Sequence, residues 1–141
     1  MKNHKAILSA IGEVTGGHFA ELLVAEVLGG KVVDEDGYDI LCPDARQVEV
    51  RSRVEGTDSK TPRVTLTAKK MAICTDVVAI RFNNNYVPIE ARLVQRNELE
   101  DLYSQYLQTD GKTAHLNWQK FCASTGAVDI LPDVLAVYDS L

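Results

Sequence analysis

The sequence has no long apolar run, few cysteines and no excess of positive charge. No stretch approaches the ~20 consecutive apolar residues that a transmembrane helix needs, so we expect no membrane partner. The 3 cysteines are widely spaced and form no metal-ligand pattern. Because an odd, scattered set of thiols favours neither a disulfide framework nor a zinc site, we expect reduced cysteines in a cytoplasmic protein.

The charge balance is acidic, with 15 Lys and Arg against 20 Asp and Glu and a net charge of −5. A protein that binds nucleic acid mainly through electrostatics is usually basic. The middle third of the chain nevertheless holds a group of basic residues, namely Arg51, Arg53, Lys60, Arg63, Lys69, Lys70 and Arg81. The charge pattern therefore permits a nucleic-acid partner without establishing one.

Several common functional signatures are missing as well. The paired glycines at 16–17 and 29–30 form no phosphate-binding fingerprint, because no strand leads into a Gly-x-Gly-x-x-Gly turn. The histidines lack metal-ligand spacing, and no serine lies in a nucleophile elbow.

The length of 141 residues favours one domain over 1–141, since no repeat, low-complexity segment or linker divides the chain. Apolar periodicity predicts helices over 3–14, 18–28, 97–107, 115–124 and 132–140, with Asn97 and Glu100 capping the third. It also predicts extended segments over 31–33, 38–42, 47–54, 76–82 and 86–94, and a strand end with a short helix over 64–72. Asn83, Asn84 and Asn85 suggest a tight turn with positive φ between the last two strands. We therefore predict an α/β or α+β fold with a central mixed sheet flanked by helices.

A charged pattern lies on the predicted hairpin of strands 38–42 and 47–54. Asp39 is early on the first strand, and Glu49 and Arg51 are two residues apart on the second. Because side chains alternate along a strand, Glu49 and Arg51 share one face, while Val48 and Val50 share the other. Two acids and a cation on neighbouring strands suggest a site that holds a metal ion against a phosphate.

The predicted helix 18–28 carries a third acid. Its residues are apolar nearly all round the helix, which indicates a buried helix interrupted only by Glu21 and Glu26. A carboxylate in such surroundings is costly unless something compensates it. Two interpretations stay open: one or both glutamates reach solvent at the helix edge, or at least one of them, with Glu21 preferred, belongs to a functional site.

Together these residues resemble the PD-(D/E)XK nuclease superfamily, whose restriction-endonuclease-like core packs a helix on a mixed sheet. Its pattern has an acid on the first core helix, an Asp on one strand, and an acid, any residue and a Lys on the next strand. The matching segments are Gly17-His18-Phe19-Ala20-Glu21, Gly37-Tyr38-Asp39 and Val48-Glu49-Val50-Arg51-Ser52-Arg53. The resemblance covers a core of about 15–95, with a helical C-terminal extension of about 96–141 outside it. The chain departs from the pattern at Tyr38, where the family has Pro, and at Arg51, where it usually has Lys.

The resemblance implies metal-dependent phosphodiester hydrolysis of nucleic acid, with Glu21, Asp39, Glu49 and Arg51 as catalytic residues. Mg²⁺ or Mn²⁺ would bind Asp39, Glu49 and the backbone carbonyl of Val50, with Glu21 acting through water or on a second ion. Arg51 would contact phosphate oxygens, because Arg stays protonated and cannot act as a base.

Three further basic residues could contact nucleic acid, with DNA as the expected substrate. Arg53 shares a strand face with Arg51, although it could equally be a solvated charge at a strand end. Lys69 and Lys70 could contact the substrate or supply the missing amine, although solvated helix positions are the simpler interpretation.

Two other classes of function stay open. The Arg at position 51 and the acidic net charge favour an inactive restriction-endonuclease-like fold that binds DNA or protein. A homodimer is suggested by an apolar helical stripe, which could instead belong to the core, made of Leu99, Leu102, Tyr103, Tyr106 and Leu107.

Overall fold

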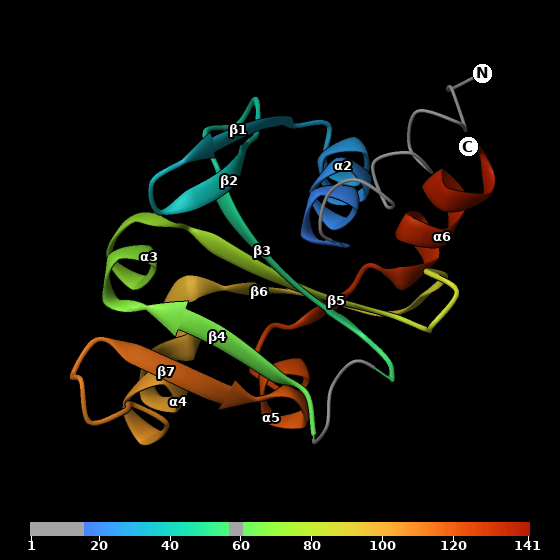
Figure 1. Ribbon diagram of the computed structural model, residues 1–141. Coiled ribbons are helices and arrows are strands. Elements are labelled where there is room, and N and C mark those ends of the chain that lie inside the picture. The colour runs from blue at the N-terminus through green and yellow to red at the C-terminus, as the bar shows by residue number, and fades with distance from the viewer. Residues whose placement is uncertain (1–15, 57–60) are drawn as a thin grey trace.

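A computed structural model describes residues 16–56 and 61–141, and the helix predicted over 3–14 lies outside these residues. The described chain forms a central six-stranded sheet in the order β1-β2-β3-β5-β6-β8 (Figure 1). Only the β3–β5 pair is parallel, so the sheet is mixed, as predicted. The strands are β1 (Lys31–Glu35), β2 (Tyr38–Leu41), β3 (Gln47–Val54), β5 (Asp76–Phe82), β6 (Pro88–Gln95) and β8 (Val128–Asp129).

Two helices pack against one face of this sheet. α2 (Gly16–Leu28) lies over β3, and α6 (Leu131–Asp139) lies over β6 and beside α2 (Figure 1). They bury a core with residues from both layers, including Phe19, Leu23, Val48, Val50 and Val134. No helix within 16–56 and 61–141 has the length and apolar character to cross a membrane.

The opposite face is covered by a second, two-stranded antiparallel sheet of β4 (Arg63–Thr67) and β7 (Thr113–Asn117) (Figure 1). Four short helical elements accompany it: α3 (Ala68–Ile73), η1 (Arg96–Leu99), α4 (Glu100–Gln105) and α5 (Trp118–Cys122). A separate core forms there from residues such as Leu66, Val77, Leu116 and Phe121. The central sheet is therefore covered on both faces and separates the two cores, to both of which β5 and β6 contribute.

The two predicted hairpins are confirmed. β2 and β3 pair antiparallel around a turn at 42–46, and β5 and β6 pair antiparallel around 83–87. The prediction of positive φ at the asparagines is wrong, because Tyr86 adopts it with φ 59°. Asn83 instead stabilises the loop with its side-chain oxygen, which accepts from the backbone N–H groups of Asn85 and Val87 at 2.9 and 3.0 Å.

The segment after residue 95 is less helical than predicted. The helix expected over 115–124 is wrong at its start, since Thr113–Asn117 is a strand that buries Ala114 and Leu116 in alternation. The helix there begins only at Trp118, after Asn117 accepts a capping hydrogen bond from the backbone of Lys120.

The predicted Asn97 cap is also wrong. Residues 96–99 form a 3₁₀ turn, and the side chain of Leu99, which precedes α4, makes no capping hydrogen bond. Leu99 is fully buried, with Leu102, Tyr103 and Tyr106 packed against the same core. The stripe considered for a dimer thus belongs mostly to the interior.

Candidate active site

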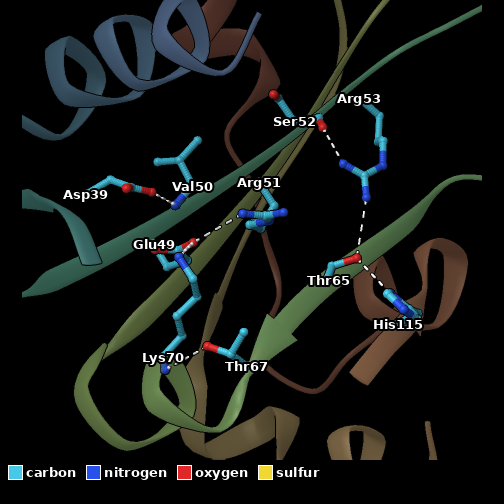
Figure 2. Close-up of polar contacts among 10 residues, drawn as sticks. All are labelled: Asp39, Glu49, Val50, Arg51, Ser52, Arg53, Thr65, Thr67, Lys70 and His115. Atoms are coloured by element: carbon cyan, nitrogen blue, oxygen red, sulfur yellow. Dashed lines mark hydrogen bonds and ion pairs between the residues drawn. The ribbon is translucent and has the colours of Figure 1, made fainter. Parts of the chain in front are cut away.

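Asp39 and Glu49 lie next to the last paired residues of β2 and β3, where the pairing of the two strands ends. The two strands pair at Ile40 with Val48, so extending the register by one residue sets Asp39 opposite Glu49. The Oδ2 atom of Asp39 accepts a hydrogen bond of 2.9 Å from the backbone N–H of Val50 (Figure 2). A residue in a strand directs its N–H and C=O to the same edge, so the carbonyl of Val50 also faces Asp39.

Two further acids join Asp39 from other elements. Carboxylate oxygens of Glu21 on α2, Asp34 on β1 and Asp39 on β2 all lie within 4.8 Å of one another. Asp34 is not among the predicted site residues, and it lies between the predicted extended segments 31–33 and 38–42. A register shift in β1 between Val32 and Glu35, with Asp34 at φ 49°, interrupts the alternation there. Such bulges change the direction of side chains, so the alternation of side chains along a strand cannot predict where Asp34 points.

The electrostatics of this acid cluster favour a bound cation or proton. The pKa of Glu21 is raised from 4.5 to about 8, first by burial and next by a hydrogen bond with the carboxyl group of Asp34. The negative charges of Asp39, Asp34 and Glu49 raise this pKa further. At neutral pH the group therefore holds a proton that a divalent cation would displace.

Glu49 is a fully buried carboxyl group beside this cluster. Its Oε2 atom lies 2.5 Å from Nζ of Lys70 and 3.6 Å from Nη1 of Arg51 (Figure 2). Burial nevertheless raises the pKa of Glu49 to about 7. The negative charge of Asp39 also raises this pKa, whereas the positive charges of Lys70 and Arg51 lower it. The second oxygen, Oε1, is buried and has no hydrogen-bond partner within residues 16–56 and 61–141, so it can still accept a bond.

Lys70 reaches Glu49 because α3 begins directly after β4. The N-cap residue Thr67 accepts a hydrogen bond from the backbone N–H of Lys70 at 3.4 Å, which fixes the first turn of the helix. The side chain of Lys70 then extends to β3 (Figure 2). Its neighbour Lys69 turns the other way and forms an ion pair with Asp36, in the turn between β1 and β2.

Arg53 continues the charged face of β3 beyond Arg51. Its Nη1 donates to the carbonyl of Ser52 at 2.9 Å, and its Nη2 lies 3.5 Å from Oγ1 of Thr65 on β4 (Figure 2). Thr65 also pairs with Nδ1 of His115 on β7, at 2.9 Å. Arg53 is thus half-buried between the two sheets, and the alternative of a solvated strand end does not describe its environment.

The structure brings most of the predicted residues into one region. Glu21, Asp39 and Glu49 influence one another electrostatically, and Arg51 contacts Glu49. Glu26, the other acid of α2, is exposed. Asp34 was missed, and Lys70 contacts a buried acid, whereas a solvated helix position was the simpler expectation.

A scan against protein-family models finds no match for this chain, and a search of curated proteins finds no match either.

Proposed function

We propose that this protein hydrolyses phosphodiester bonds of nucleic acid with the help of a divalent metal ion. The observation that carries this proposal is the meeting of three carboxylates from α2, β1 and β2 within 4.8 Å, beside a buried Glu49 with one unpartnered oxygen. DNA is the proposed substrate, and the fold is proposed to be a restriction-endonuclease-like core.

The arrangement of elements supports the proposed core. α2, which carries Glu21, packs on β3, which carries Glu49 and Arg51. β2 pairs antiparallel with β3, and β3 pairs parallel with β5. This is a helix packed on a mixed sheet, with the acids at the point where two strands diverge.

The residues present fit a hard divalent cation. Carboxylate and carbonyl oxygens are the ligands that Mg²⁺ and Mn²⁺ prefer. Asp39, Asp34 and the carbonyl of Val50 would hold the ion, with Oε1 of Glu49 and the carboxylate of Glu21 completing the set. When bound, such an ion lowers the pKa of a water ligand and neutralises charge on the phosphate.

Lys70 and Arg51 supply the positive charge that the protein itself contributes. The Lys70 amine holds Glu49 in place and can donate a hydrogen bond to an attacking water. Lys70 would thus take the role of the Lys in the family's motif, although Lys70 lies on α3 and not on the strand that carries the acid. Arg51 remains protonated and would bind the non-bridging phosphate oxygens that gain charge in the transition state.

Cleavage of supercoiled plasmid and of single-stranded DNA, with Mg²⁺ or Mn²⁺, tests the proposal. We expect wild-type nicking that needs the metal, and a loss of about a hundredfold or more in Asp39→Asn and Lys70→Gln. Glu35→Gln is the matched control, because it removes an exposed acid from the same hairpin. Metal-independent DNA binding without nicking by the wild type would instead support the inactive binding module.

A further inference from the structure

Three arginines gather on the face of the central sheet that lies under β4 and β7. We call Arg51 on β3, Arg81 on β5 and Arg92 on β6 the arginine cluster. The register pairs Ala79 with Arg51 on one side and with Arg92 on the other. Arg81 is two residues along β5 from Ala79 and shares its face. The three side chains therefore surround an alanine, whose single methyl group leaves space between them.

The positive charge of this cluster is poorly compensated within the protein. The Nε atom of each of the three arginines is buried and has no hydrogen-bond partner in the part of the chain that the structure describes. Arg51 shares Glu49 with Lys70 at 3.6 Å, and Arg92 lies 4.0 Å from Asp129. Among the described residues, the guanidinium of Arg81 makes no hydrogen bond or ion pair. The nearby acids therefore compensate these half-buried cations only in part: Glu49 is shared with Lys70, Asp129 is at the limit of an ion pair, and Glu90, opposite Arg81 in the register, forms no ion pair with it among the described residues. Incompletely compensated charge is costly, so the site favours an anion.

The cluster is still open to a ligand. The side chains of Arg51 and Arg92 are 30% and 33% exposed, so their terminal nitrogens reach solvent while Nε is turned inward. The carboxylate of Glu90, on the same face of the sheet, is already hydrogen-bonded, since its Oε1 accepts from Nε1 of Trp118 at 2.6 Å. Guanidinium groups bind phosphate through paired N–H donors, and partial desolvation strengthens this attraction.

We propose that the arginine cluster binds a backbone phosphate of a nucleic-acid strand, adjacent to the phosphate presented at Glu49. Arg51 links the two positions, because it is two residues from Glu49 on the same face of β3. The inference rests on the proposed function for its choice of ligand, but the binding itself needs no metal. It also reconciles a net charge of −5 with a nucleic-acid partner, since the positive charge is concentrated at one place.

Fluorescence anisotropy with a short labelled DNA single strand, in EDTA, tests the cluster apart from catalysis. We expect Arg81→Gln and Arg92→Gln each to weaken binding about tenfold and to reduce the salt dependence by about one phosphate contact. Arg81→Lys should keep the salt dependence of the wild type. Arg46→Gln, which removes an arginine from the distant β2–β3 turn, should bind as the wild type does.

Thermal unfolding separates binding from a structural role. We expect Arg81→Gln to unfold at the wild-type temperature or higher, because the guanidinium that it removes makes no hydrogen bond or ion pair with the described residues. Inorganic phosphate should raise the unfolding temperature of the wild type more than that of Arg81→Gln. Wild-type DNA binding that is absent in EDTA, or equal losses in Arg81→Gln, Arg92→Gln and Arg46→Gln, would overturn the proposal. Metal-dependent nicking, measured separately, decides the catalytic proposal.

Discussion

The amine of Lys70 lies 2.5 Å from Oε2 of Glu49, although the two residues are 21 positions apart and on different elements. This contact joins the short helix α3 to the buried strand β3. It gives a fully buried carboxyl group its nearest cation.

Lys70→Gln should destabilise the protein, and more so at high pH. The pKa of Glu49 is about 7 in the fold against an ordinary value of 4.5, so stability falls as pH rises between these values. Without Lys70 the pKa of Glu49 rises further, and the fall continues above neutral pH. We expect a loss of about 2 kcal/mol at alkaline pH, since Arg51 still partly compensates the charge.

Urea unfolding at pH values below 6 and above 8 measures this effect. Lys69→Gln is the control, because Lys69 pairs with an exposed Asp36 and should change stability little. Equal losses in the Lys70 variant at both pH values would show that the contact with Glu49 contributes nothing to the pH dependence.

Glu21→Gln should stabilise the metal-free protein at neutral and alkaline pH. The unfolded chain loses the Glu21 proton near 4.5, whereas the folded protein keeps it to about 8, so wild-type stability falls as pH rises across this window. The neutral amide does not share this fall. We expect an unfolding temperature higher by about 4 °C near the upper end of the window, and no difference below its lower end.

Differential scanning calorimetry in EDTA, repeated across this pH range, gives the comparison. If the Glu21 variant instead melts lower than the wild type near pH 8, the acid cluster does not carry the repulsion described above.

Asp34→Asn should weaken Mn²⁺ binding about tenfold, because it removes one of the three clustered carboxylates. Isothermal titration calorimetry in two buffers of different ionisation enthalpy should also detect proton release on binding to the wild type near neutral pH. This release follows from the raised pKa of Glu21. The neighbouring Glu35→Gln should bind Mn²⁺ with wild-type affinity, and equal affinity in the Asp34 variant would remove that residue from the ligand set.

Gly37→Ala should destabilise the hairpin that carries Asp34 and Asp39. Gly37 has φ 112°, and an added Cβ would lie 2.9 Å from Cδ1 of Ile73 on α3. Strain and crowding together should cost about 2 kcal/mol. Gly111→Ala is the matched control, since φ is also positive there but a Cβ meets nothing within 4 Å. Equal losses in the two variants, measured by urea unfolding, would assign no part of the cost to the contact with Ile73.

The faces on which the β3 side chains lie could be predicted because the signal is local. The alternation along 47–54 predicted that Glu49 and Arg51 face away from Val48 and Val50, and the two cores confirm it. The buried character of α2 followed in the same way from its apolar residues.

The places of Asp34 and Lys70 in the candidate site depend on tertiary structure. Asp34 joins the acid cluster because of a bulge in β1, and the spacing of apolar residues in the sequence does not predict a bulge. Lys70 reaches Glu49 from a helix that follows β4, and β4 belongs to a second sheet with β7. Residues 115–117 of β7 fall within the helix predicted over 115–124. A five-residue strand that leads directly into a helix is too short for its apolar residues to distinguish the period of a strand from that of a helix.

The position of α3 has one further consequence. This helix grips the β1–β2 turn through Ile73 against Gly37 and Lys69 against Asp36, while Lys70 holds β3. Because α3 contacts both the β1–β2 turn and β3, a substitution that displaces this helix would move the acids of the hairpin and Glu49 together.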